Sequence, residues 1–259
     1  MAIAQSKIHH NSDYTVALFG PDHSPQEIRT EAISLGADPE QICFVKSASD
    51  KNSPGFMEIH PPVFGPTNTV DHIKADATYI GPGQAAVFRT AGCLVGVEFE
   101  RRSHQAVVWH GGRAAMTPQR NGPVYFNILN LCHEKLVLGI AEPELEMYLT
   151  GCIGADNFKH DHPEARGLIS PFASNFPIEV AFNSYKLGTL DLKRIARFQA
   201  IEQIGIPERN IKDDGLCTAS TSWLADFRTA TTKEGKLARN YIVVIVHWED
   251  VPYSKGRGL

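Results

Sequence analysis

Two short apolar runs, separated by a polar turn, constrain this chain more than any other feature. The runs are Leu94–Phe99 and Ala106–Trp109, and residues 100–105 between them are charged or polar. Apolar runs of this length, bounded by turn residues, are typical of buried strands that pair as a hairpin. In such a hairpin Cys93 enters and His110 leaves at the same end, so we expect the two to be neighbours in space.

A thiol and an imidazole brought together in this way can serve as metal ligands or as a nucleophile and its base. A buried cysteine beside a structural histidine is the alternative interpretation, because free cysteines commonly pack as small apolar residues.

Strands and helices intermix along the rest of the chain. Residues 24–27 read Ser-Pro-Gln-Glu, a capping box that predicts a helix ending at Gly36. Asp191 can cap a second helix, and the apolar run Tyr241–Trp248 predicts a central strand. Because no repeat or linker interrupts this order, the sequence predicts one α/β domain over residues 1–259, with layered mixed sheets flanked by helices.

Some shorter segments also carry a pattern. Val124, Ile128 and Cys132 fall at helical spacing, whereas Pro177–Phe182 resembles a strand. Leu145–Leu149 alternates apolar residues with Glu146 and Tyr148, which predicts a half-buried strand. Residues 1–14 and 254–259 are expected to be loose tails.

Composition excludes several classes of protein. The net charge is −4, from 25 Lys and Arg against 29 Asp and Glu, so neither nucleic acid nor an anionic membrane is an expected partner. No apolar run approaches the ~20 residues that span a bilayer, and the N-terminus lacks a signal core, so we expect a cytoplasmic location. The five cysteines are widely spaced without C-x-x-C, which argues against a disulfide framework. The oligomeric state stays open.

The residues around Cys93 and His110 resemble the motifs of the YfiH-type family, also called the multicopper polyphenol oxidase or laccase-domain family. The family motifs T-A-D-C and H-A-G-W-R-G correspond here to Thr-Ala-Gly-Cys at 90–93 and His-Gly-Gly-Arg-Ala-Ala at 110–115. Further matches lie at 75–77, 151–154, 190–192, 216–218, 227–228 and Arg239. Their order and spacing cover the chain from about residue 17 to residue 246.

The resemblance implies a single α/β domain and a zinc-dependent purine nucleoside phosphorylase. The implied reaction converts adenosine, inosine or methylthioadenosine and phosphate into the base and a pentose 1-phosphate, with adenosine deamination as a second activity. One cysteine and two histidines would hold the zinc, which corresponds to Cys93, His110 and an earlier histidine. A Cys/His₂ ligand set does not exclude copper.

The earlier histidine has two possible positions. One alignment matches it to His60, and the other, which runs without gaps, matches it to Ala48. With Ala48 only two ligands remain, whereas a catalytic zinc normally has three protein ligands and a water. The sequence also has Gly92 in place of the motif aspartate, and Arg113-Ala114 in place of Trp-Arg.

The chemistry of an intact site follows from the residue types. Zinc lowers the pKa of a bound water to about 7, so hydroxide could deaminate adenosine, whereas bound phosphate could attack the ribose. Backbone donors of Gly111 and Gly112 and the guanidinium of Arg113 or Arg228 would bind phosphate. If they do not bind phosphate, Arg113 is expected to be an ordinary surface residue, and Arg228 is expected to belong to a structural ion pair. Asp76 would orient a ligand histidine or cap a turn.

Two alternatives come from other classes of protein. In a metal-free hydrolase, Cys93 would be a nucleophile activated by His110. In a binding protein, the departures at Gly92, Ala114 and Ala48 would mark a fold that has lost its chemistry. A measurement of the bound metal would distinguish the hydrolase, which needs none, from the zinc enzyme.

Overall fold

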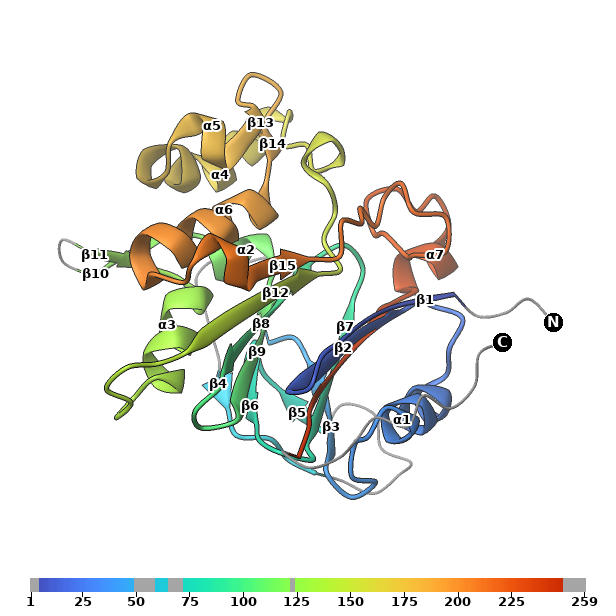
Figure 1. Ribbon diagram of the computed structural model, residues 1–259. Coiled ribbons are helices and arrows are strands. Elements are labelled where there is room, and N and C mark those ends of the chain that lie inside the picture. Colours follow the sequence, from blue (N-terminus) through green and yellow to red (C-terminus); the bar gives the residue numbers. More distant parts are fainter. Residues whose placement is uncertain (1–4, 49–58, 65–71, 122–123, 249–259) are drawn as a thin grey trace.

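Two six-stranded sheets lie face to face at the centre of the protein (Figure 1). The computed structural model describes residues 5–48, 59–64, 72–121 and 124–248. The first sheet has the order β1 (Ser6–His10), β2 (Tyr14–Phe19), β16 (Asn240–Val246), β7 (Ala85–Thr90), β3 (Ile42–Lys46) and β5 (Ile73–Lys74). The second has the order β15 (Ile211–Asp213), β12 (Leu145–Thr150), β8 (Leu94–Glu100), β9 (Gln105–Gly111), β6 (Ala77–Ile80) and β4 (Ile59–His60).

Helices cover the two outer faces. The longer ones are α1 (Pro25–Ser34), α3 (Ile128–Leu136), α4 (Pro163–Asn175) and α6 (Leu192–Gln199), and the short ones are α2 (Arg113–Met116), α5 (Ile178–Ala181) and α7 (Lys233–Leu237). Two small hairpins pair β10 (Gln119–Asn121) with β11 (Val124–Phe126), and β13 (Phe182–Ser184) with β14 (Thr189–Leu190). None of these helices is long and apolar enough to cross a bilayer.

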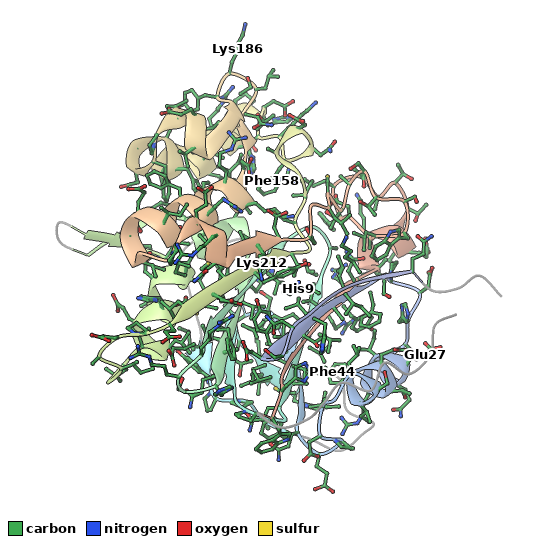
Figure 2. All side chains as sticks on the ribbon, viewed as in Figure 1. His9, Glu27, Phe44, Phe158, Lys186 and Lys212 are labelled. Atoms are coloured by element: carbon green, nitrogen blue, oxygen red, sulfur yellow. The ribbon has the colours of Figure 1, made fainter. Side chains whose placement is uncertain are left out.

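The buried apolar side chains form three layers. One layer fills the space between the two sheets and includes Phe88, Val97 and Val244. A second joins the first sheet to α1, where Phe44 packs (Figure 2). The third joins the second sheet to α3, α4, α5 and α6. The architecture is therefore four layers of the type α/β/β/α, which confirms the predicted class of layered mixed sheets flanked by helices.

The strongest predicted strand is confirmed as β16, which lies between β2 and β7. Its residues alternate between two apolar layers, with Ile242 and Val244 toward the second sheet and Val243 and Ile245 toward α1. Because both faces are covered, the strand is continuously apolar. Both faces of β12 are covered as well, so this strand is buried along its whole length. Its alternating apolar and polar residues had predicted a half-buried strand.

The hairpin of the central stretch is also confirmed. In β8 and β9, Leu94 lies opposite Gly111 and Gly96 lies opposite Trp109. A Cβ atom on Gly96 would overlap the indole of Trp109, so this position needs glycine. The register places His110 opposite Val95, at the end where Cys93 enters.

Both capped helices begin where predicted. Ser24 accepts the N–H of Glu27, and the Glu27 side chain accepts the N–H of Ser24, which is the capping box at the start of α1. Asp191 accepts the N–H of Arg194 at the start of α6. The helical course of α6 continues through Ala200–Ile204 and ends at Gly205, which has a φ of 84°.

Three local predictions need correction. Ser6–His10 forms the edge strand β1, although residues 1–14 were expected to be loose. The helix expected from Val124 begins at Ile128, because β11 occupies residues 124–126. Pro177 begins the helix α5 rather than a strand, since a short apolar run after a proline fits either structure. The tail at 254–259 lies outside the described residues.

Candidate active site

A cavity of about 540 Å³ opens where the chain passes from the first sheet to the second. Strand β7 ends at Thr90 in the first sheet, and β8 begins at Leu94 in the second, so residues 91–93 form the crossing turn. The Thr90 hydroxyl accepts the N–H of Cys93 (2.9 Å) and donates to its carbonyl oxygen (3.0 Å). These two bonds fix the turn that carries the Cys93 thiol, which is partly exposed to the cavity.

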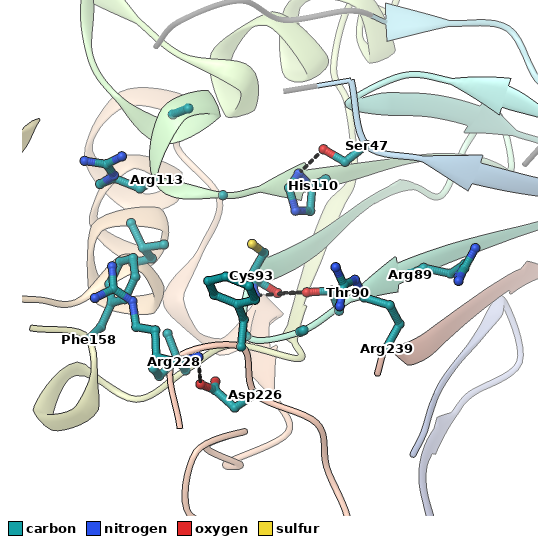
Figure 3. Close-up of a pocket in the computed structure, with 17 residues that line it drawn as sticks. Ser47, Arg89, Thr90, Cys93, His110, Arg113, Phe158, Asp226, Arg228 and Arg239 are labelled. Atoms are coloured by element: carbon teal, nitrogen blue, oxygen red, sulfur yellow. Dashed lines mark hydrogen bonds between the residues drawn. The ribbon is translucent and has the colours of Figure 1, made fainter. Parts of the chain in front are cut away.

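Cys93 and His110 lie side by side, as the hairpin predicts (Figure 3). A Cβ atom built on Gly112 would be 3.6 Å from both Cys93 Sγ and His110 Nε2, so the three residues surround one point. The thiol and the imidazole are hydrogen-bonded to each other.

Each member of the pair favours the charged form of the other. Burial alone would raise the pKa of Cys93, but the charge of His110 and hydrogen bonds from His110 and Thr90 bring this pKa below its usual value. Burial alone would lower the pKa of His110, but Cys93 and then Asp76 raise it to about 10. The two residues therefore shift each other toward a thiolate–imidazolium pair.

Two further side chains orient the imidazole. Ser47 Oγ lies 2.9 Å from His110 Nδ1 and donates to Asp76 Oδ1 at 3.0 Å. Asp76 is fully buried, its Oδ1 lies 3.7 Å from His110 Nδ1, and its backbone carbonyl accepts the His110 N–H at 2.7 Å. With Nδ1 held in this way, Nε2 faces the thiol. Of the two roles considered for Asp76, this position suits the one that orients His110.

Sequence reasoning missed Ser47. It directly follows β3, which runs parallel to β7, and the carboxyl ends of parallel neighbours meet at one edge of a sheet. The signal was therefore present in the position of Ser47 directly after a strand, but nothing in the sequence shows which strands are neighbours.

The structure does not bring His60 to this pair. His60 is exposed on β4, at the far edge of the second sheet, whereas buried Ala48 adjoins Ser47. Among the described residues, no group of three His, Cys, Asp or Glu side chains could hold a metal ion. Within the described part of the chain, the donor set of Cys93 and His110 is one protein ligand short of a catalytic zinc and does not fit it. Of the two alignments, the one ending at Ala48 agrees with this geometry.

Arginines line the cavity on both sides of Cys93 (Figure 3). Arg113 begins α2, and its buried Nη1 has no hydrogen-bond partner among the described residues. Arg228 has no ion pair within the described residues; its guanidinium carbon lies 4.4 Å from the centre of the Phe158 ring, and it donates to the Lys159 carbonyl at 2.7 Å. Both expected arginines thus border the cavity. Arg89 and Arg239 also line it, and sequence reasoning gave them no role.

The space beside Gly92 is filled by Asp226. Gly92 has a φ of +103°, and a Cβ atom there would lie 2.5 Å from Asp226 Oδ2. That oxygen accepts the Thr218 hydroxyl at 2.6 Å, and Oδ1 accepts the N–H of Arg228 at 2.9 Å. Where the resembling motif carries an aspartate, this chain thus has a glycine and a carboxylate from a distant loop.

The remaining predicted residues take different positions. Gly112 and Ala114 line the cavity, whereas Gly111 ends β9 and packs against Trp109. Cys132 is a core residue of α3, as expected, and Cys152 is fully buried.

Cys217 is partly exposed outside the cavity, and its Sγ accepts the N–H of Gly154 at 3.0 Å. Burial would raise the pKa of Cys217, but hydrogen bonds from Ser220 and from backbone N–H groups lower it below the usual value. A second thiol with thiolate character therefore lies outside the cavity.

No model of a known protein family matches the sequence, and no curated protein matches it. Solved structures do match. The Bacillus licheniformis hypothetical protein YfiH is 17% identical, with a TM-score of 0.65 over 89% of this chain and 92% of that one. YlmD from Geobacillus stearothermophilus is 15% identical, with a TM-score of 0.64 over 91% and 93%. A Neisseria meningitidis protein of family DUF152 is 14% identical, with a TM-score of 0.62 over 94% and 99%.

The protein therefore has the YfiH-type fold, as the resemblance of its motifs predicts. At these identities the likeness establishes the fold, and the chemistry has to be argued from this chain's own residues.

Proposed function

We propose that the cavity is the active site of a cysteine hydrolase in which Cys93 is the nucleophile and His110 the acid and base. One observation carries this proposal: a thiol, an imidazole, a hydroxyl and a buried carboxylate follow one another as Cys93, His110, Ser47 and Asp76. A nucleophile beside a base that a third group orients is the arrangement that activates a thiol.

The reaction would act on an acyl compound such as an ester, thioester or amide. Cys93 Sγ attacks the carbonyl carbon, and a carbon–sulfur bond forms. The bond to the leaving group breaks as that group takes the proton from His110 Nε2. The neutral imidazole then takes a proton from water, whose oxygen attacks the thioester. This step releases the acid and restores the thiolate and the imidazolium.

Ser47 and Asp76 position the imidazole in this scheme. The Ser47 hydroxyl accepts from Nδ1 and donates to Asp76, so the ring keeps its proton on Nδ1 when Nε2 is deprotonated. Neither residue touches the reacting carbon. Their contribution is to keep Nε2 aimed at the sulfur during both halves of the reaction.

An activated ester tests the proposal. The purified protein is mixed with p-nitrophenyl acetate, and the acyl group is located by peptide mass spectrometry. We expect acetyl on Cys93 and release of p-nitrophenol, both abolished by Cys93→Ala and unchanged by Cys217→Ser, which removes the other activated thiol. If Cys93 stays unmodified and Cys93→Ala releases p-nitrophenol as fast as the wild type, the proposal is refuted.

A second candidate is phosphorolysis of purine nucleosides, which the arginines beside Gly112 and the YfiH-type fold favour. Arg113 and Arg228 would hold phosphate by paired N–H donors. No step of this candidate involves zinc, because the described donor set does not fit that ion. Chromatography of adenosine incubated with phosphate, with and without zinc, tests this candidate. Adenine that forms only with phosphate and intact Cys93 would support it, and inosine would indicate deamination instead. A protein that gives neither product and no acyl adduct would be a binding protein.

A further inference from the structure

The four arginines of the cavity form two pairs on opposite sides of Cys93 (Figure 3). Arg89 and Arg239 belong to the first sheet. Arg89 lies on β7, and Arg239 directly precedes β16, whose Asn240 lies opposite Thr90. The pairing of these two strands therefore brings the two arginines together.

The other pair comes from segments beside the second sheet. Arg113 follows β9 at the start of α2. Arg228 lies in a loop that is tied to the crossing turn, because the N–H of Phe227 donates to the carbonyl of Ala91 at 3.1 Å. Two different parts of the fold thus each bring arginines to the cavity that holds Cys93.

Within each pair the like charges repel each other. Burial and then Arg228 lower the pKa of Arg113, and burial and then Arg89 lower the pKa of Arg239. Such proximity is unfavourable unless an anion lies between the guanidinium groups. Within the described residues, Arg113, Arg228 and Arg239 form no ion pair, although the protein as a whole has a net charge of −4.

Among the described residues that line the cavity, Asp226 carries the one carboxylate, and it does not neutralise Arg113, Arg228 or Arg239. Both oxygens of Asp226 are already bound: Oδ2 accepts the Thr218 hydroxyl, and Oδ1 accepts the backbone N–H groups of Arg228 and Thr229. Asp226 therefore shapes the loop that carries Arg228. The cavity keeps its excess of positive charge.

Each pair also has one guanidinium held over an aromatic ring. Arg228 lies 4.4 Å from the centre of the Phe158 ring, and Arg89 lies 5.8 Å from that of Tyr241. Such contacts fix the plane of the guanidinium before a ligand arrives. The buried, unpartnered Nη1 of Arg113 adds a donor at the cavity wall. Both sides of Cys93 are thus prepared to bind an anion.

We infer that the substrate is a small acyl compound with an anionic group on each side of its reactive carbonyl. The pair Arg113 and Arg228 binds one anionic group, Arg239 binds the other, and the carbonyl carbon lies at Cys93. Carboxylates and phosphates both fit paired arginine donors. A cavity of about 540 Å³ has the size of a small-molecule site. This inference rests on the proposed hydrolase and names its class of substrate.

Binding to the Cys93→Ser protein tests the inference without depending on thiol chemistry. Calorimetry at constant ionic strength compares glutarate, which has a carboxylate at each end, with 3-phosphonopropionate and with the monoanion butyrate. We expect both dianions to bind at least ~10-fold more tightly than butyrate, as two charge-assisted contacts should exceed one. Tighter binding of 3-phosphonopropionate than of glutarate would assign a phosphate to one pair, and the reverse would assign carboxylates to both.

One variant from each side completes the test. Arg113→Gln and Arg239→Gln should each reduce glutarate affinity to about that of butyrate. Arg194→Gln is the matched control, because its guanidinium pairs with Asp191 outside this cavity. Thermal unfolding of each variant confirms that it is folded. If butyrate binds as tightly as both dianions, or if either cavity variant leaves their affinity unchanged, the inference is wrong.

The two proposals can fail separately. An acetyl adduct on Cys93 without a preference for dianions would leave the hydrolase and remove the substrate class. Tight binding of dianions without any adduct would refute the hydrolase, and with it the acyl character of the ligand, while leaving a site for dianions.

Discussion

Gly92→Ala should be one of the most destabilising single-methyl changes in the protein. Alanine at a φ of +103° is strained by about 1–3 kcal/mol. Its Cβ atom would lie 2.5 Å from Asp226 Oδ2, so the carboxylate must move and lose its bond to the Thr218 hydroxyl. A hydrogen bond to a charged group contributes about 1.5–3 kcal/mol. The expected loss is the sum, about 2.5–6 kcal/mol, which is a large part of the stability of an ordinary domain.

Urea unfolding followed by circular dichroism measures this loss. Two glycine-to-alanine controls separate its causes. Gly139 has a φ of +83° with nothing within 4 Å of an added Cβ, so Gly139→Ala should show the backbone strain alone. Gly167 lies inside α4 with equally open space, so Gly167→Ala should stabilise the protein by about 0.5–1 kcal/mol.

A double-mutant cycle with Asp226→Ala isolates the clash. In the Asp226→Ala background, Gly92→Ala should cost no more than Gly139→Ala costs in the wild type, because the carboxylate is gone. If Gly92→Ala costs the same with and without Asp226, or costs less than 1 kcal/mol in the wild type, the carboxylate does not fill the space that we assign to it.

Three further predictions concern the site and its surroundings. In a Cys217→Ser background, iodoacetamide should alkylate Cys93 at a lower pH than it alkylates an ordinary thiol. His110→Asn should shift the dependence of the alkylation rate on pH to higher pH, because the effect of burial on the thiol is then unopposed. If His110→Asn leaves this dependence unchanged, the ion pair is contradicted. The rate of hydrolysis should fall as the pH rises through about 10, because His110 then loses its proton. Ser47→Ala should lower kcat ~10–100-fold with little change in KM. A change in KM alone would argue against a positioning role for Ser47. Burial and the neighbouring arginines lower the pKa of His160 to about 4. The free energy of unfolding should therefore decrease by about 2 kcal/mol as the pH falls from 6.5 to 4, because the unfolded chain binds the proton more tightly. His160→Gln should remove this pH dependence, and equal acid sensitivity in the two proteins would show that His160 does not cause it.

The parts of the site that the sequence could predict are those joined by local pairing. Cys93 and His110 flank one hairpin, so the register of two adjacent strands is enough to bring them together. The capping box of α1 and the apolar run of β16 likewise depend on neighbouring residues alone.

The rest of the site depends on contacts between distant segments. Ser47 reaches His110 through the parallel neighbours β3 and β7, and Arg239 reaches Arg89 through β16 and β7. Asp226 takes the space beside Gly92 because a loop from the other end of the chain passes there. No local pattern encodes which strands become neighbours, so these residues were missed. For the same reason, the sequence alone could not decide whether His60 or Ala48 corresponds to the earlier histidine of the family motif.

The crossing turn makes chemical competence a late event in folding. Ser47 is anchored to the first sheet, Asp76 and His110 belong with the second, and Cys93 lies on the turn between them. These contacts span tens of residues along the chain, and long-range contacts of this kind form slowly. Before the sheets dock, the hairpin can bring His110 beside Cys93, but Ser47 does not yet hold the imidazole. The fully oriented arrangement of Cys93, His110, Ser47 and Asp76 therefore forms only when both halves of the sandwich have come together.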